Sequence, residues 1–268
     1  MKTVTSRDNP AYKSVARLVA SASERRKTGL TVLEGAHLLG AFLDSGGRPE
    51  RVMASPAGIA DAEIARLVER SAPAAVTLLS DSLFASLSTL DTPTGVLACV
   101  RTPPPHPAGA DTRLALLLED IQDPGNVGML LRSAAAAGAE HVLLSPSCAF
   151  AWSPKVLRAA MGAHFATNIV ERADLAAWMA RYRGQSVALA GDAPRSLYDL
   201  DLGRPTALLV GNEGAGLSPS LREAATYRAC IPMAARMESL NAAAAGTIAL
   251  FEALRQRSLV RRRAETIS

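Results

Sequence analysis

A turn in the middle of the chain places an asparagine and an arginine where they could bind a substrate. The turn, Pro124-Gly125, comes shortly after the apolar run Leu114–Leu118. Asn126 can cap the helix that this turn starts, and Arg132 would lie about two turns into that helix. An arginine in this position could clamp a phosphate or a developing negative charge. The same pattern is also typical of an ordinary strand, turn and helix with a surface arginine.

A glycine-rich segment follows a second apolar run. Gly211, Gly214 and Gly216 surround Glu213, directly after the run Thr206–Val210. Glycine permits unusual backbone angles and lets a ligand approach the main chain closely. The spacing G-x-x-G-x-G differs from the dinucleotide-binding fingerprint and from the P-loop. The segment is therefore either a ligand-binding loop of another kind or a plain connection.

A third segment, Ile231–Asn241, joins an apolar stretch to an alanine-rich region that is typical of a helix. Ser239 and Asn241 are both residues that start helices well. Capping alone would explain either of them, so this segment taken by itself favours a structural role.

The three segments occur in a fixed order, DPGNVGxxxR, then GNEGxGLS, then IPM…ESLN, between Arg113 and Arg257. Together they resemble the three motifs of the SpoU (TrmH) family of RNA 2′-O-methyltransferases. The resemblance implies an α/β domain with the knotted topology of the SPOUT class, although general rules of chain connection disfavour knots. It also implies S-adenosylmethionine as cofactor, RNA as partner, and a homodimer with its active site at the subunit interface.

The resemblance carries roles onto individual residues of this chain. The catalytic residues that it implies are Arg132, Asn126, Glu213, Ser239 and Asn241. The residues that it implies for the cofactor are Val210, Gly211, Asn212, Gly214, Ile231, Met233, Ser239 and Leu240. Two positions depart from the family's pattern, since Ala235 replaces a frequent glycine and Ala160 a common serine. Both replacements are small, and they put loop detail in doubt rather than activity.

Arg132 is the residue to which the family's pattern assigns activation of the ribose hydroxyl. A free guanidinium has a pKa above about 12, so a literal base would need a very large shift. We favour the hypothesis that Arg132 keeps its proton, clamps a neighbouring phosphate and stabilises the developing alkoxide. Glu213 would orient Arg132 or another cation, Asn126 and Ser239 would position the ribose and its phosphate, and Asn241 would brace the loops.

A proline-rich stretch at residues 101–112 divides the chain. Its prolines exclude regular helix and strand and favour an extended linker. Residues 1–100 are expected to form a smaller α/β domain, and residues 113–268 the methyltransferase domain. The first domain, with Leu33-Glu34-Gly35 and Thr94-Gly95-Val96, resembles the accessory RNA-binding domain of the same family.

Apolar runs and turn residues predict α/β alternation in both parts. The expected strands are Thr31–Glu34, Arg51–Ala54, Val76–Leu79, Gly95–Val100, Leu114–Leu118, His141–Leu144, Ser186–Ala190, Thr206–Val210 and Tyr227–Ile231. The expected helices are Ala11–Lys27, Ala36–Leu43, Ile59–Arg70, Ser82–Leu87, one from the Pro124 turn to Ala137, Pro154–Met161, Asp174–Arg181, Ser218–Ala225 and Asn241–Arg257.

Composition favours a cytoplasmic protein, and its charge is compatible with a nucleic-acid partner without being diagnostic of one. The net charge is +4, and basic residues gather near both ends, where they are either RNA contacts or a solvated helix face. The three cysteines form no metal-binding or disulfide pattern, which suits a reducing compartment, and no metal site is expected. The sequence has no apolar run long enough to cross a membrane and no signal-peptide core.

The identity of the RNA is open at this level. Large-subunit ribosomal RNA is the first choice because the accessory domain resembles that of family members acting there, and tRNA is the second. Two other classes of protein compete: a nucleotide-binding oxidoreductase or transferase on a doubly wound sheet, and a non-catalytic RNA-binding protein with the same fold. The missing GxGxxG argues against the first. The full set of implied catalytic residues argues against the second.

Overall fold

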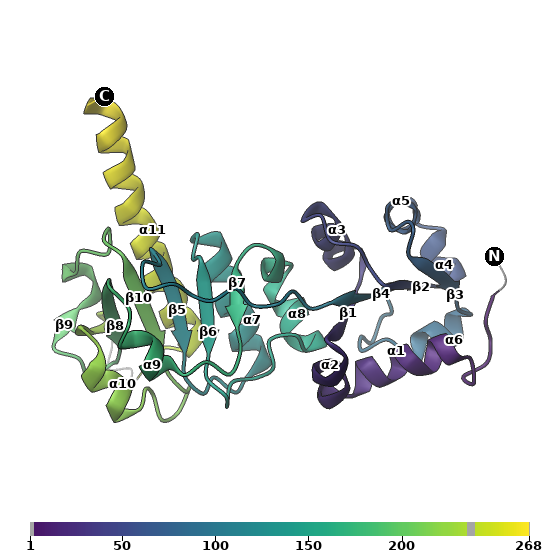
Figure 1. The fold of residues 1–268 in the computed structure, drawn as a ribbon, viewed down its shortest axis with the longest axis horizontal. Coiled ribbons are helices and arrows are strands. Elements are labelled where there is room, and N and C mark those ends of the chain that lie inside the picture. The colour runs from purple at the N-terminus through teal and green to yellow at the C-terminus, as the bar shows by residue number, and fades with distance from the viewer. Residues whose placement is uncertain (1–2, 235–238, 268) are drawn as a thin grey trace. The chain divides into compact units, whose positions relative to one another are not determined.

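The computed structural model describes residues 3–234 and 239–267, with side chains as far as Leu259 in the last helix. It contains two compact units (Figure 1). The first unit comprises the chain up to Pro104 together with Trp152–Phe165. The second comprises Pro105–Ala151 and the chain from Ala166 onward.

The first unit is built on a four-stranded mixed sheet. Its order is β1 (Leu30–Glu34), β4 (Val96–Arg101), β2 (Arg51–Ala54) and β3 (Ala75–Leu78). β4 runs antiparallel to both β1 and β2, while β2 and β3 are parallel. The helices of this unit are α1 (Pro10–Ala20), α2 (Ala22–Thr28), α3 (Ala36–Asp44), α4 (Pro56–Ile59), α5 (Ala62–Arg70), α6 (Asp81–Ala85), α8 (Pro154–Ala160) and the 3-10 turn η1 (Ala163–Phe165).

Side-chain caps explain where these short helices begin. The Asn9 side chain accepts hydrogen bonds from the backbone N–H of Ala11 and Tyr12, and Pro10 follows it at the first helical position. Ser21 ends α1 and caps α2, so the long helix expected over Ala11–Lys27 is two helices. A serine cap needs an extended backbone, which interrupts the helix at that residue.

The segment Trp152–Phe165 belongs to the first unit, although the sequence places it inside the expected methyltransferase domain of residues 113–268. The Thr31 hydroxyl on β1 donates a buried hydrogen bond to the Trp152 carbonyl, at 2.8 Å. The rings of Phe42 and Phe165 meet edge to face, with centroids 5.2 Å apart. These contacts join residues far apart in the sequence, so periodicity could not reveal them.

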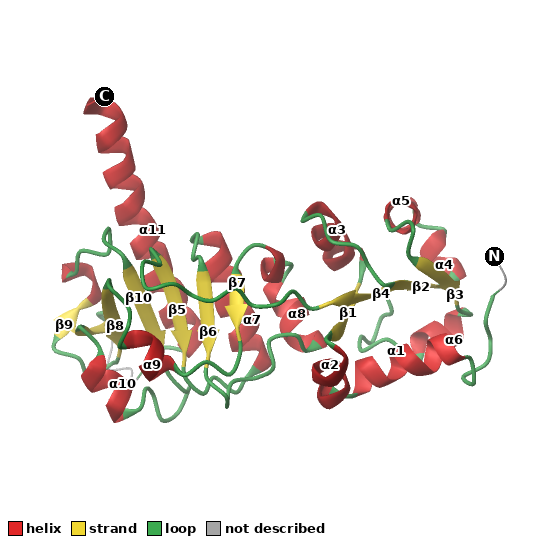
Figure 2. Ribbon diagram, viewed as in Figure 1, coloured by secondary structure: helices red, strands yellow, loops and turns green. Residues whose placement is uncertain are grey.

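The second unit is an all-parallel seven-stranded sheet (Figure 2). Its order is β7 (Asn168–Val170), β6 (His141–Leu144), β5 (Leu114–Leu118), β10 (Thr206–Val210), β8 (Gln185–Leu189), β11 (Tyr227–Cys230) and β9 (Arg195–Ser196). Every residue of β5 and β10 is buried, as expected for the continuous apolar runs of a parallel sheet covered on both faces.

The helices of the second unit are α7 (Pro124–Ala136), α9 (Leu175–Met179), α10 (Pro219–Ala224), α11 (Ala242–Ile267) and the 3-10 turn η2 (Leu197–Asp199). α11 packs against both α7 and the central strand β10. A hydrogen bond of 2.7 Å between the hydroxyls of Ser133 and Thr247 joins the two helices. Strands β5, β10, β8 and β11 are neighbours in this parallel sheet, so the loops that leave their carboxyl ends lie along one edge. Ligands of parallel α/β proteins bind at this edge.

Part of the proline-rich segment is packed rather than a free spacer. No helix or strand forms between β4 and β5, as the prolines predict. The His106 backbone N–H donates to the Asn168 side chain at 2.9 Å, and the Trp178 indole donates to the Ala108 carbonyl at 3.0 Å. Of the expected linker of residues 101–112, the part from Pro105 onward is therefore packed in the second unit.

Within the described part of the chain, no helix combines the length and the apolar composition that a membrane span requires.

The approach of α4 to the turn before β4 leaves no room for a side chain. A Cβ added to Gly58 would lie 2.3 Å from the Gly95 carbonyl oxygen, and backbone atoms there cannot move aside. Gly58→Ala should therefore destabilise the first unit by about 1–3 kcal/mol. Hydrogen exchange of the β2 and β4 amides measures this loss.

Gly40→Ala is the matched control. A Cβ at Gly40 would meet only the end of the Leu67 side chain, at an ordinary 3.7 Å. Since alanine favours a helix interior over glycine, this variant should gain about 0.5–1 kcal/mol. Equal losses in both variants would contradict the close backbone approach.

Candidate cofactor and catalytic site

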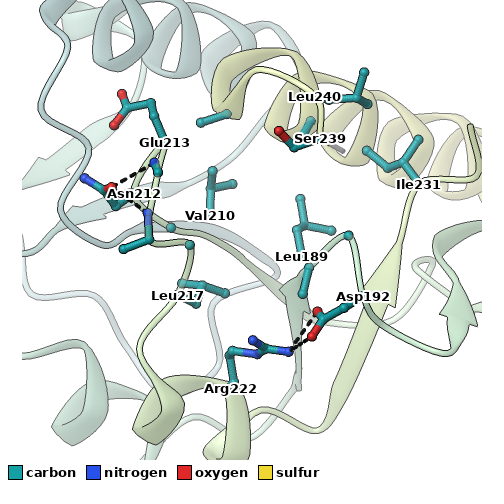
Figure 3. Close-up of a pocket in the computed structure, with 18 of the residues that line it drawn as sticks. Leu189, Asp192, Val210, Asn212, Glu213, Leu217, Arg222, Ile231, Ser239 and Leu240 are labelled. Atoms are coloured by element: carbon teal, nitrogen blue, oxygen red, sulfur yellow. Dashed lines mark hydrogen bonds and ion pairs between the residues drawn. The ribbon is translucent and has the colours of Figure 1, made fainter. Parts of the chain in front are cut away.

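The glycine-rich loop after β10 is organised by Asn212. Its side-chain oxygen accepts hydrogen bonds from the N–H of Gly214 at 2.9 Å and of Ala215 at 3.0 Å (Figure 3). Its amide nitrogen donates to the Asp120 carbonyl at 2.8 Å, which ties the loop to the end of β5. One side chain thus fixes the loop's shape and its place beside the neighbouring strand.

Two glycines of this loop are required by its geometry. A Cβ on Gly211 would lie 2.2 Å from the Gly216 carbonyl carbon and from the Leu217 nitrogen. Gly216 itself has a φ of +70°, which residues with a side chain rarely adopt. The loop therefore folds back on itself only with glycine at both positions.

A cavity of about 260 Å³ lies against this loop. Residues from the ends of β8, β10 and β11 and from the start of α11 line it (Figure 3). Every residue predicted to bind the cofactor is among them, namely Val210, Gly211, Asn212, Gly214, Ile231, Met233, Ser239 and Leu240. Segments that the sequence separates thus form one wall.

Other residues of the cavity were not anticipated from the sequence. Leu189 ends β8, Ala190, Gly191 and Asp192 follow it, and Arg222 comes from α10. The strand before them was expected, but its place next to β10 depends on strand order. No local pattern reports that order, so the sequence carried no signal for this part of the wall.

The lining suits a ligand with an apolar ring and polar edges. Leu189, Val210, Leu217, Ile231 and Leu240 offer aliphatic surface for a purine. The glycine-rich loop offers main-chain polar groups, and carboxylates of the wall can meet a cation. The residues present therefore fit S-adenosylmethionine, which combines an adenine, a ribose and a cationic sulfur.

Three of the predicted catalytic residues form a hydrogen-bonded chain. Asn126 donates from its amide nitrogen to the Glu213 carboxylate, at 2.8 Å. Its amide oxygen accepts from the Asn241 amide nitrogen, at 3.1 Å. Asn126 is only 9% exposed, so both of its polar ends are used inside the protein. These hydrogen bonds connect the starts of α7 and α11 with the glycine-rich loop.

The capping prediction for Asn126 is wrong. Asp123 is the residue that caps α7, and its carboxylate accepts from the Asn126 backbone N–H at 2.8 Å. The Asn126 side chain is therefore free to bind Glu213 and Asn241. Asn241 both binds Asn126 and caps α11. Its side-chain oxygen accepts a hydrogen bond from the backbone N–H of Ala243, at 2.9 Å, at the start of that helix.

Hydrogen bonds hold Glu213 in its ionised form. Burial by itself would raise the pKa of this carboxyl, but donation by Asn126 and by backbone amides, including those of Asp123 and Gln122, lowers it below the ordinary value. Glu213 is therefore an anion at neutral pH, placed where the loop after β10 meets the start of α7.

Arg132 lies apart from this cluster. It is exposed on α7, and within the described residues no hydrogen bond or ion pair holds its side chain. It does not line the cavity, whereas Ser239 does. The expected contact between Glu213 and Arg132 is absent from the described part of the chain, where Asn126 is the side-chain partner of Glu213.

The two departures from the family's pattern fall outside the cavity or outside the described residues. Ala160 is fully buried at the end of α8, in the first unit. Ala235 lies outside the part of the chain that the structure describes. No cluster of metal-binding side chains occurs among residues 3–234 and 239–259.

Comparison with known proteins identifies both parts of the chain. The model of the SpoU rRNA Methylase family matches residues 113–251. The chain belongs to this family. A second model, the MRM3-like substrate binding domain, matches residues 9–98. This membership confirms the expectation of an S-adenosylmethionine-dependent methyltransferase and replaces the oxidoreductase alternative.

Relatives of the SpoU family match nearly the whole chain. An uncharacterized tRNA/rRNA methyltransferase of Synechocystis sp. is 34% identical, covering 94% of this chain and 93% of its own length. The 23S rRNA (guanosine(2553)-2′-O)-methyltransferase of Bacillus subtilis is 30% identical, covering 94% of this chain and 98% of its own length.

Solved structures of SpoU-type enzymes share the fold. The AdoMet-bound rRNA methyltransferase of Sinorhizobium meliloti has a TM-score of 0.83 at 29% identity, covering 95% of this chain and 97% of its own. An RNA 2′-O ribose methyltransferase has the same TM-score at 30% identity, covering 96% and 99%. These likenesses confirm the expected fold class, a SPOUT-type α/β domain with a smaller α/β domain before it.

Asn126→Ala tests the hydrogen-bonded chain. It leaves the Glu213 carboxylate without its side-chain donor while burial remains, so the pKa of Glu213 should rise. A carboxyl group whose pKa is lowered in the folded state stabilises the fold at pH values above its ordinary pKa. This stabilisation is lost as the pH falls through the lowered pKa. The variant should thus lose about 1–3 kcal/mol of stability at pH 7, and less in acid. Carbon NMR of the Glu213 carboxyl measures its pKa, and denaturant titration measures the free energy of unfolding.

Asn168→Ala provides the comparison for this experiment. Asn168 also joins two segments through its side chain, binding His106 and His141, but it lies on β7 and does not line the cavity. This variant should lose stability without changing the pKa of Glu213. An unchanged Glu213 titration in Asn126→Ala would contradict the role given to Asn126.

Proposed function

We propose that this protein transfers a methyl group from S-adenosylmethionine, bound in the cavity against the glycine-rich loop, to a ribose 2′-hydroxyl of large-subunit ribosomal RNA. The observation that carries the proposal is the convergence of the three motif segments. Their predicted cofactor residues line one cavity, and Asn126, Glu213 and Asn241 are bonded together beside it. An ordinary surface loop has no need of this arrangement.

Ribosomal RNA is favoured over tRNA by the extent of the likeness. The rRNA enzymes of Bacillus subtilis and Sinorhizobium meliloti match 94% and 95% of this chain. A structure described for 2-OH methylation of C/U34 on tRNA covers only 55% of it. Both units of this protein therefore have counterparts in these two rRNA enzymes, which supports a large-subunit substrate.

The chemistry demands alignment more than activation of the methyl donor. S-adenosylmethionine supplies a methyl group on a cationic sulfur, which is already a strong electrophile. The protein's residues must hold the ribose oxygen in line with it, and such positioning can remove several kcal/mol from the barrier. We assign this task to Ser239, which is exposed at the cavity, and to the Asn126 cluster beside it.

Arg132 completes the site from the protein surface. Met129 is 49% exposed on α7, and Phe251 is 45% exposed on α11, the helix that packs against α7. Exposed apolar side chains on packed helices suit the interface of a symmetric dimer. Arg132 is on the exposed side of α7, so its side chain is accessible to a second copy that packs there and to RNA.

The basic ends of the chain are partly structural. Arg25 is buried, and its guanidinium donates to the Leu18 carbonyl at 2.5 Å and the Val19 carbonyl at 3.0 Å. Arg255 pairs with Glu252. Exposed Lys13, Arg17, Arg26 and Lys27 lie along α1 and α2, a surface suited to phosphates.

A reducing compartment fits the cysteines, which are all free. We therefore place the protein in the cytoplasm, where ribosomal RNA is assembled and disulfides are rare.

The proposed substrate is tested with RNA from cells that lack the gene. The purified protein, given labelled S-adenosylmethionine, should label 23S rRNA from these cells and leave tRNA unlabelled. Mapping of 2′-O-methyl groups should show one site missing without the gene. Labelling of tRNA alone would overturn the ribosomal assignment.

Arg132→Ala and Arg132→Lys test the role of the arginine. Because Arg132 does not line the cavity, both variants should bind S-adenosylmethionine with unchanged affinity in calorimetry. Methyl transfer should fall about 100-fold or more, as for loss of a charge-stabilising donor. Near-normal turnover by either variant would refute the clamp.

Phe251→Glu tests the proposed dimer. A charge at the centre of an apolar interface cannot be solvated, so the variant should sediment as a monomer and lose methyl transfer. Tyr198→Glu is the control, since Tyr198 is similarly exposed, at 52%, but belongs to η2. A wild-type protein that sediments as a monomer would contradict the dimer outright.

A further inference from the structure

Three described residues of the cavity wall carry charge: Asp192, Glu213 and Arg222. Glu213 is held by Asn126, at the side of the cavity toward α7. Asp192 and Arg222 form an ion pair in the loop region after β8 and on α10 (Figure 3). The Arg222 terminal nitrogen Nη2 lies 2.8 Å from one carboxylate oxygen of Asp192 and 2.7 Å from the other.

The positive member of this pair is the more enclosed. The Arg222 side chain is 30% exposed and that of Asp192 is 68% exposed. An exposed ion pair stabilises a fold very little, because water screens it. Stability is therefore a weak reason for a charged pair in this wall, and the charge that the cavity's ligand carries offers a stronger one.

S-adenosylmethionine has one net positive charge, from a sulfonium, an ammonium and a carboxylate. The product that remains after methyl transfer has lost the sulfonium charge and is neutral overall. A cavity with an unpaired arginine in its wall would repel the cationic form and leave the neutral form unaffected. A paired arginine has its field cancelled by the adjacent carboxylate.

We propose that Asp192 is a specificity-determining residue, which neutralises Arg222 and so keeps the cavity from repelling cationic S-adenosylmethionine in favour of the neutral demethylated product. The proposal rests on the cofactor site proposed above. Asp192 acts through charge here and takes no part in the methyl transfer itself. Arg228 on β11 is a further positive charge that acts on Asp192, and it is constant across the variants below.

Calorimetric dissociation constants for S-adenosylmethionine and S-adenosylhomocysteine test this directly. Asp192→Asn should weaken S-adenosylmethionine binding about three- to tenfold and S-adenosylhomocysteine binding less than about twofold. Arg222→Gln should shift the ratio of the two constants in the opposite direction, because Asp192 then stands alone. The double variant should return the ratio to within about twofold of the wild type.

Glu223→Gln is the matched control. Glu223 lies next to Arg222 on α10 and is exposed, but it does not line the cavity. Its replacement removes one negative charge beside Arg222, as Asp192→Asn does, and should leave both dissociation constants unchanged. Raised salt should reduce the effect of Asp192→Asn, since screening weakens charge repulsion.

Equal weakening of both ligands by Asp192→Asn would overturn the proposal, because it would show that the pair only holds the loop after β8. Unchanged binding of both ligands would overturn it as well. Gly211→Val separates these outcomes from failure of the site itself, since its side chain collides with the backbone of Gly216 and Leu217. Normal cofactor binding by Gly211→Val would instead refute the cavity as the cofactor site.

Discussion

The hydrogen bonds of Asn126 hold together the part of the molecule on which the site depends. Its side chain reaches Glu213 in one direction and Asn241 in the other, residues 87 and 115 positions away. Glu213 follows β10 and Asn241 follows β11, so the two segments would be independent without Asn126. A buried amide that uses its donor and its acceptor cannot leave either partner without cost. This satisfied pair of bonds joins the starts of α7 and α11 and the glycine-rich loop into one surface.

The parallel sheet supplies the frame for that surface. Strands β8, β10 and β11 end along one edge, so the segments that follow them must share the same small volume. The loop after β10 fits there because Gly211 and Gly216 let it fold back on itself, and Asn212 fixes the resulting shape. Apolar side chains and main-chain groups then face one cavity, which is the combination that an adenosine-containing cofactor needs.

The charged residues in and near the cavity have different environments. Glu213 is kept anionic by its donors, and Arg222 is balanced by Asp192. Arg132 stays outside, exposed on α7 beside apolar surface. The cavity of one chain is thus suited to the cofactor, whereas Arg132 lies outside it on the surface of α7. This separation is the reason for proposing that a second copy completes the site.

Sequence by itself determined many of the helices and strands through local chemistry, and its resemblance to the family's motifs named residues that line the cavity. Apolar runs predicted the buried strands β5 and β10, and the three motif segments predicted the cofactor residues that line the cavity. Tertiary structure decided everything that depends on strand order and long-range contact. It made Asp123 rather than Asn126 the cap of α7, brought Asp192 and Arg222 into the wall, and assigned Trp152–Phe165 to the first unit. The physical reason is that caps and periodicity act over a few residues, whereas these contacts arise only once distant strands have paired.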